Sequence, residues 1–129
     1  MEDTINFKVI LIGENNVGKT SIIIRYTTNT FNPLQLSTIG ASFVNKVIKI
    51  NNDKIVKFEI WDTAGQEKYR SVNRLFYQNA SVCILVYDIT RKSSFEALKN
   101  YWIKDIKENI QKKQVRNFII FFSICFGWK

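Results

Sequence analysis

An eight-residue run, Gly13–Thr20 (GENNVGKT), directly follows the apolar run Phe7–Ile12. It fits the phosphate-loop pattern G-x-x-x-x-G-K-S/T. A buried strand that turns through a glycine-bearing loop into a helix aims several backbone N–H groups at one point, where the positive end of the helix dipole also lies. The run therefore predicts a receptor for a polyphosphate, to which Lys19 adds a cation and Thr20 adds a hydroxyl for an accompanying Mg²⁺.

The composition excludes several kinds of catalytic site. The chain has 129 residues, 46% of them hydrophobic, which is enough for one domain with one core. It has no histidine, so Ser-His-Asp and Cys-His mechanisms and histidine-ligated zinc are excluded. Cys83 and Cys125 sit in apolar runs without C-x-x-C spacing, which favours buried thiols in a reducing compartment such as the cytoplasm.

The net charge of +8 is unevenly distributed. Residues 1–65 carry seven basic and six acidic side chains, whereas residues 66–129 carry twelve basic and five acidic ones. Such a basic half is compatible with acidic lipid, an acidic protein or nucleic acid. A solvated, lysine-rich helix face is the explanation we favour, and we expect no nucleic-acid partner.

Hydrophobic patterning predicts alternating strands and helices. A capping box at Ser93–Glu96 predicts the start of a helix with an apolar stripe at Phe95, Leu98, Trp102, Ile106 and Ile110. The other predicted helices cover residues 18–27 and, irregularly, 67–79, and the predicted strands cover residues 5–12, 42–50, 54–61, 81–87 and 117–124. This order predicts a single α/β domain over residues 1–129 with a mostly parallel sheet and right-handed crossovers.

Strand parity predicts which side chains share a face. Over residues 54–61, Val56, Phe58 and Ile60 share one face, and Trp61 falls on the opposite, more polar face. Phe43 groups with polar residues by the same parity. Two large aromatics on outward faces predict a partner-binding patch, the alternative being that a neighbouring loop covers each of them.

A second motif, Trp61–Glu67 (WDTAGQE), follows the carboxyl end of a strand, where open α/β sheets bind their ligands. Asp62 is placed to hold Mg²⁺, and Gly65 has no side chain to keep its N–H from a terminal phosphate. Gln66 has an amide that can orient an attacking water. Thr38 offers a second hydroxyl to Mg²⁺ when a terminal phosphate is present, which predicts an order–disorder switch.

These motifs resemble those of the Rab family of Ras-superfamily small GTPases, over about Phe7 to Asn109. The signatures are Thr38–Phe43 (TIGASF), Lys57–Glu67 (KFEIWDTAGQE) and Leu85–Thr90 (LVYDIT), and the first two resemble the early-endosomal branch. The resemblance implies a three-layer, Ras-like P-loop NTPase fold with about five of its six strands present. It also implies a GTP-binding switch in vesicle or endosomal transport that hydrolyses GTP to GDP with Mg²⁺.

The resemblance also implies roles for individual residues. Phe31 matches the aromatic that packs against guanine, and Gln66 and Lys19 take the catalytic positions. Phe43, Trp61 and Phe76 match the aromatic triad that effectors read, alongside exchange factors and GTPase-activating proteins as partners. The residues expected to hold the nucleotide are Gly13, Asn15, Asn16, Val17, Gly18, Lys19, Thr20, Ser21, Phe31, Thr38, Asp62 and Gly65, and those expected to hold Mg²⁺ are Thr20, Thr38 and Asp62.

Two departures from the family pattern matter. Asn15 and Asn16 stand where the family has small residues, and their bulk beside the terminal phosphate predicts slow hydrolysis. The guanine-reading motif N-K-x-D is missing, since the chain runs Ser123–Lys129 (SICFGWK) instead. Losing its two charge-assisted hydrogen bonds predicts guanine binding weakened by roughly 10²–10⁴-fold.

Three function classes therefore stay open. The first is a Rab-like switch, and the second is a truncated, hydrolysis-poor fragment that binds nucleotide or effectors. The third, a P-loop phosphotransferase, is disfavoured because the Asp62–Gln66 segment orients a water. Cys125 is not in a prenylation motif, so we expect membrane association only for an intact, prenylated form at the endosomal surface.

Overall fold

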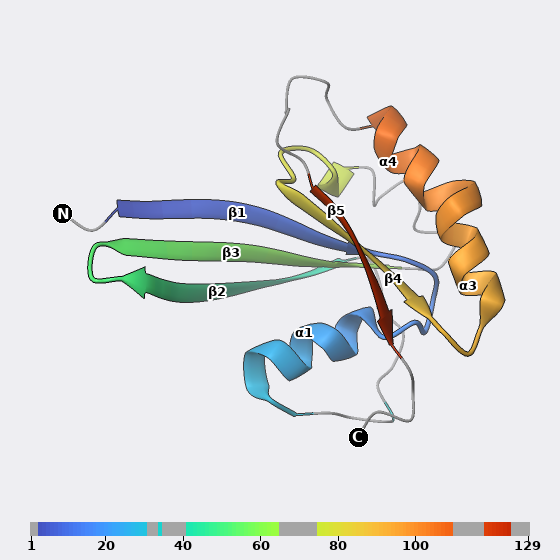
Figure 1. Ribbon diagram of the computed structural model, residues 1–129, viewed down its shortest axis with the longest axis horizontal. Helices are drawn as coiled ribbons and strands as arrows, with labels where there is room; N and C mark the ends of the chain where they lie inside the picture. The colour runs from blue at the N-terminus through green and yellow to red at the C-terminus, as the bar shows by residue number, and fades with distance from the viewer. Residues whose placement is uncertain (1–2, 31–33, 35–40, 65–74, 110–117, 125–129) are drawn as a thin grey trace.

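The computed structural model describes residues 3–30, 34, 41–64, 75–109 and 118–124. Within them one sheet has the strand order β2-β3-β1-β4-β5 (Figure 1). Only the β2–β3 pair is antiparallel, and the other three pairs are parallel. The predicted mostly parallel α/β sheet of five strands is confirmed. The strands are β1 (Asp3–Ile12), β2 (Ala41–Asn51), β3 (Lys54–Thr63), β4 (Val82–Asp88) and β5 (Phe118–Ile124).

Helices cover the two faces of this sheet (Figure 1). On one face α1 (Lys19–Thr28) closes a cluster of Val9, Leu11, Val17, Ile23, Ile60 and Val86. On the other face lies a continuous helical segment made of α3 (Lys92–Ala97), the π-helical turn η2 (Leu98–Trp102) and α4 (Ile103–Asn109). It closes a cluster of Ile10, Ile12, Tyr77, Ala80, Cys83, Leu85, Leu98, Trp102 and Ile106. Alternate residues of β1 thus pack into clusters on opposite faces of the sheet. The fold therefore has three layers, with the sheet between helices on both faces.

The start of α3 corrects the capping-box prediction. The helix begins at Lys92, so Ser93 lies inside it, and no side chain caps its amino end at Arg91. The buried Ser94 explains the difference. Its hydroxyl accepts the N–H of Asp88 at 3.0 Å and donates to the Arg91 carbonyl at 2.7 Å, which holds the turn between β4 and α3.

The apolar stripe of this helical segment is largely confirmed. Leu98, Trp102 and Ile106 are fully buried, whereas Phe95 at the start of the stripe is 37% exposed. Ile110 lies outside the described residues. The buried Tyr77 donates its hydroxyl to the carboxylate of Asp105 at 2.8 Å, so the segment after the described helical residues Leu75 and Phe76 is bonded to α4.

Strand parity identified the face of both aromatics, but only Phe43 is exposed on it. Val56 and Ile60 are buried on the α1 side as expected, and Phe43 is 42% exposed. Trp61, predicted to face outward, is half-buried and packs against the cluster beneath α3 and α4. Parity identifies the face on which a side chain lies, but not whether another element covers that face. Here Phe76 lies against the indole of Trp61, with ring centroids 5.0 Å apart.

Cys83, the second residue of β4, is fully buried, and burial raises the pKa of its thiol to about 12. The predicted buried thiol at this position is confirmed, and Cys125 lies outside the described residues. Among the described helices, none has the length and apolar content needed to cross a membrane.

Candidate functional site: the phosphate loop and Asp62

The loop after β1 lies against the neighbouring strand β4. A Cβ atom added at Gly13 would lie 2.2 Å from the backbone carbonyl oxygen of Val86, a distance no side chain can accept. Glycine at this position therefore lets the loop leave the sheet in contact with β4. Strands β1, β3 and β4 run parallel, so their carboxyl ends share this edge.

Two left-handed residues turn the loop into α1. Asn16 has a φ of 61° and Gly18 has a φ of 101°. Asparagine tolerates this region better than most residues, and glycine adopts it without strain. The chain then enters α1 at Lys19, so the amino end of this helix and its backbone N–H groups face the same edge of the sheet.

The Lys19 side chain folds back across the loop. It is 5% exposed, and its Nζ donates to the carbonyl oxygens of Gly13 at 2.9 Å and Glu14 at 2.7 Å. Burial lowers the pKa of Lys19 to about 8, against the opposing effects of the negative charges of Asp62 and Glu14, while the positive charge of Arg91 lowers it further. An ammonium held by carbonyls is suited to exchange them for phosphate oxygens.

Thr20 and Asp62 meet although 42 residues separate them. The Thr20 hydroxyl, in the first turn of α1, donates to Oδ2 of Asp62 near the end of β3. Asp62 is only 2% exposed, and the next residue, Thr63, donates its hydroxyl to the Leu11 carbonyl at 2.5 Å. The bond from Thr63 fixes the end of β3 against β1.

This donor set fits Mg²⁺, which prefers oxygen ligands and usually takes one or two carboxylates plus phosphates and waters. A carboxylate and a hydroxyl lie together here. In the described parts of the chain, no group of three or more His, Cys, Asp or Glu residues is close enough to hold a metal by itself. A metal at this edge would therefore need further oxygens from a phosphate or from water.

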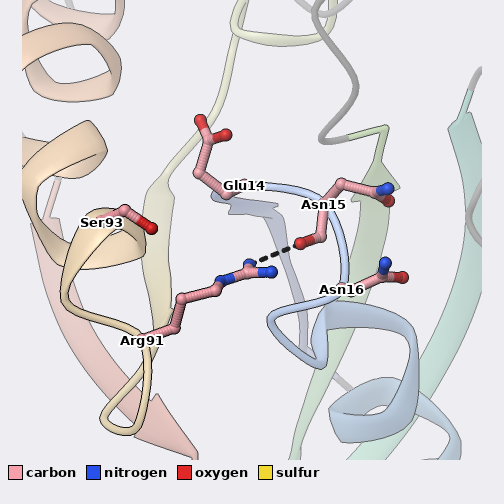
Figure 2. A pocket seen from close by; sticks show the side chains of 5 residues that line it. All are labelled: Glu14, Asn15, Asn16, Arg91 and Ser93. Atoms are coloured by element: carbon pink, nitrogen blue, oxygen red, sulfur yellow. Dashed lines mark hydrogen bonds between the residues drawn. The ribbon is translucent and has the colours of Figure 1, made fainter.

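A pocket of about 230 Å³ opens beside the loop, and Figure 2 shows the side chains that line it. Arg91, at the turn after β4, reaches across this pocket and donates from its guanidinium to the Asn15 carbonyl at 2.6 Å. The turn itself is held by Asp88, whose carboxylate accepts the backbone N–H of Thr90 at 2.9 Å. The lining residues are Glu14, Asn15, Asn16, Arg91 and Ser93.

A second contact joins the loop to the helical segment. The indole Nε1 of the buried Trp102 donates to Oε1 of Glu14 at 2.8 Å across 88 residues of sequence. Sequence reasoning missed both this bond and the role of Arg91. Trp102 was read only as a member of the apolar stripe, and no spacing rule relates residue 91 or 102 to the loop.

The structure thus brings most of the predicted nucleotide-binding residues to one edge. Gly13, Asn15, Asn16, Gly18, Lys19, Thr20 and Ser21 lie in the loop and the first turn of α1, with Asp62 against Thr20. Val17 is fully buried in the cluster beneath α1, so its contribution to a ligand would come from its backbone. Phe31, Thr38, Gly65 and Gln66 lie outside the described residues.

The three predicted effector-contacting aromatics form a continuous row. The ring centroids of Phe43 and Trp61 are 4.8 Å apart, and those of Trp61 and Phe76 are 5.0 Å apart. Phe43 and Trp61 face each other across the β2–β3 ladder. The ammonium of Lys8 lies 5.4 Å from the Trp61 ring, so the row has a cationic edge.

Comparisons with known proteins agree with this geometry. A family model described as the Ras family matches residues 8–122. The GTP-binding protein YPT52 of Saccharomyces cerevisiae is 42% identical over 113 residues, which cover 82% of this chain and 48% of that protein. The GTP-binding protein ypt5 of Schizosaccharomyces pombe is 45% identical over 104 residues, covering 81% and 49%.

Ras-related protein Rab-13 of Bos taurus is 48% identical over 103 residues, which cover 80% of this chain and 50% of that protein. The chain spans about half the length of the curated relatives it matches. The matched region contains both the phosphate loop and the Asp62 segment. The chain therefore belongs to the Ras family, and its resemblance to the Rab proteins of that family is confirmed.

Proposed function

We propose that this chain binds a magnesium–nucleotide complex at the edge formed by the phosphate loop and Asp62, as part of a Rab-like GTP-binding switch. The observation that carries the proposal is the contact between the Thr20 hydroxyl and the Asp62 carboxylate. It joins the two motifs at one point, beside an ammonium held by loop carbonyls.

The chain's own groups divide the work of binding. The loop N–H groups and the amino end of α1 attract the anionic phosphates. Lys19 exchanges its carbonyl partners for phosphate oxygens, which keeps the buried ammonium hydrogen-bonded throughout. Thr20 and Asp62 are the residues that would hold Mg²⁺, with Thr38 as a further ligand in the triphosphate state. When bound, Mg²⁺ neutralises charge on the phosphates and polarises them.

Hydrolysis of GTP to GDP rests on Gln66 to orient the attacking water. We propose that this step is slow, because Asn15 and Asn16 place side chains where the family has small residues. Single-turnover hydrolysis by Asn15→Gly against the parent tests this. A faster variant supports the crowding argument, and equal rates would reject it.

As a switch, the chain would present different surfaces with GTP and with GDP. The row of Phe43, Trp61 and Phe76 suits an effector because a half-exposed aromatic row provides apolar area for a partner. Exchange factors and GTPase-activating proteins are the further partners that the resemblance implies, and vesicle or endosomal transport is the process. The alternative is a hydrolysis-poor fragment that binds nucleotide or effectors without cycling and without preference for guanine.

Displacement of a fluorescent GDP derivative by GTP and by ATP separates these possibilities. Stronger competition by GTP supports the switch, equal competition supports the non-selective fragment, and no binding rejects nucleotide binding altogether. Lys19→Met is expected to abolish binding. Lys92→Met, which removes an equal charge from the exposed start of α3, is the matched control and is expected to leave binding unchanged.

A further inference from the structure

Arg91 is joined to the phosphate loop by a contact that the nucleotide-binding motifs do not include. Its guanidinium donates to the Asn15 carbonyl oxygen at 2.6 Å, and the side chain is partly buried. A charged donor forms a stronger hydrogen bond than a neutral one. The bond spans 76 residues and links the turn after β4 to the middle of the loop (Figure 2).

The orientation of this carbonyl determines the orientation of the next N–H. The peptide bond between Asn15 and Asn16 is trans, and in a trans peptide the C=O and N–H point in opposite directions. A carbonyl turned toward Arg91 therefore turns the Asn16 N–H away from Arg91.

Sheet order shows where that N–H is directed. Strand β1 lies between β3 and β4, so Arg91 approaches the loop from the β4 side while Asp62 lies on the β3 side. An N–H directed away from Arg91 is thus directed toward the side of the loop that carries Thr20 and Asp62. On the proposed function this is the side on which the phosphates and Mg²⁺ bind.

We propose that Arg91 is a positioning residue that holds the Asn15–Asn16 peptide with its N–H toward the phosphates before any ligand arrives. The inference rests on the proposed phosphate binding at this loop. Without Arg91 the peptide is free to rotate, because rotation moves Asn16 from its φ of 61° into the negative range that residues other than glycine prefer. Only molecules with the N–H inward would then bind, and the apparent affinity falls by their fraction.

The test compares Arg91→Ala and Arg91→Lys with Lys92→Ala. The variant Lys92→Ala removes an adjacent positive charge that contacts Glu96 on the surface and has no bond to the loop. The probes are magnesium GTP and magnesium inorganic triphosphate, measured by calorimetric titration. Thermal unfolding of each nucleotide-free variant is measured alongside.

We expect Arg91→Ala to weaken binding of both probes by about tenfold, equivalent to about 1.4 kcal/mol. Inorganic triphosphate should lose affinity by the same factor as GTP, because the phosphates and not the guanine base contact the loop. Arg91→Lys keeps a charged donor and should recover most of the loss, whereas Lys92→Ala should bind like the parent. Unfolding of the nucleotide-free Arg91→Ala protein should differ little from that of Lys92→Ala.

Other results would overturn the inference. Parent-like affinity of Arg91→Ala would do so while leaving the proposed function intact. A loss of affinity that follows a general loss of stability would assign Arg91 a structural role only. If the parent binds inorganic triphosphate but binds GTP and ATP equally, the guanine switch fails, whereas a tenfold loss of triphosphate affinity in Arg91→Ala would still support the role of Arg91. If the parent binds neither probe, both proposals fall.

Discussion

In β1 apolar residues alternate with polar ones over the first half and are continuous from Val9 to Ile12, and only the second half is buried. Residues 3–6 are exposed, including Ile5 at 39%, whereas Val9 to Ile12 are all buried. The neighbouring β2–β3 hairpin repeats the contrast at Ile60, which is 7% exposed, and Ile50, which is 59% exposed, although Val56 of β3 stays buried. The phosphate loop and Asp62 lie at the covered end, and the β2–β3 hairpin lies at the other end (Figure 1).

Element length explains this difference. A ten-residue helix such as α1 is about 15 Å long, whereas a ten-residue strand such as β1 is about 33 Å long. On its face of the sheet, α1 therefore covers less than half of the strand. The helices begin at the loop edge, so the covered half is the one that carries the site. Burial at that end restricts the conformation of the phosphate loop, whereas the hairpin end should tolerate substitutions with a smaller loss of stability.

The largest expected difference comes from the same substitution at the two ends. Ile10→Ala in the covered half should lower the free energy of unfolding by about 2–5 kcal/mol, because a fully buried side chain is replaced by a cavity. Ile50→Ala at the hairpin should lower it by about 0.5 kcal/mol or less. Urea denaturation of both variants measures this. Similar losses would mean that the hairpin end is covered in solution.

A polar contact at the covered end should have an intermediate effect. Glu14→Ala leaves the buried indole N–H of Trp102 without its acceptor, which should cost about 1–3 kcal/mol of stability. Glu14→Gln keeps an acceptor oxygen and serves as the control. Thermal unfolding followed by tryptophan fluorescence compares the two variants, and an unaffected Glu14→Ala protein would show that the bond contributes nothing.

Burial of Lys19 should make ligand binding depend on pH. Because its pKa is about 8, Lys19 is already charged below pH 8. Its titration therefore does not change the affinity for ligand in that range. Above pH 8 binding must take up a proton, so affinity should fall by up to tenfold per pH unit, about 1.4 kcal/mol. Titrations of magnesium GTP between pH 7 and pH 9.5 measure this, and Lys19→Arg, which stays charged, should lack the dependence.

The same pKa has the opposite consequence for stability without ligand. Because the pKa of Lys19 in the folded state lies below the ordinary lysine value of 10.5, unfolding takes up a proton between about pH 8 and pH 10.5. The contribution of Lys19 to stability therefore rises with pH over this window. A contribution that falls with pH would mean that Lys19 is not desolvated.

The smallest effect is expected where the covered and uncovered regions meet. The ammonium of Lys46 on β2 lies 5.6 Å from the ring of Tyr26 near the end of α1. Lys46→Ala should lower the free energy of unfolding by about 0.5–1 kcal/mol, as for exposed cation–π pairs. Lys54→Ala at the exposed hairpin end of β3 is the matched control. Equal stability of the two variants would show that the pair contributes nothing.

Local patterns were sufficient to predict the strands and their mostly parallel arrangement. Apolar runs with high β-propensity and the turn residues between them are features of a few neighbouring residues, so they can be read from the sequence. They also predicted that Gly13 to Thr20 and Asp62 lie at one edge of the sheet, as the contact between Thr20 and Asp62 shows, and the binding roles of these residues stay predictions. They failed where a contact outside the pattern decides the outcome. Ser94 was read as part of a cap, but its hydroxyl bonds to the backbone of Asp88 and Arg91 instead.

The same limit applies to the loop's external contacts. The bonds from Arg91 to Asn15 and from Trp102 to Glu14 join residues 76 and 88 positions apart. Nothing local in an arginine after a strand, or in a tryptophan on an apolar stripe, distinguishes it as a loop contact. The exposure predicted for Trp61 was wrong for a related reason, because alternation along β3 does not reveal that Phe76 lies over the indole.

The burial of Cys83 provides a chemical reporter in the centre of the sheet. A thiol with a pKa near 12 and no accessible surface does not react with an alkylating reagent while β4 is in place. In a Cys125→Ser background, its labelling rate would measure how often the strand separates from its neighbours under native conditions. Comparing that rate with and without magnesium nucleotide would show how much ligand at the loop edge suppresses opening of the sheet.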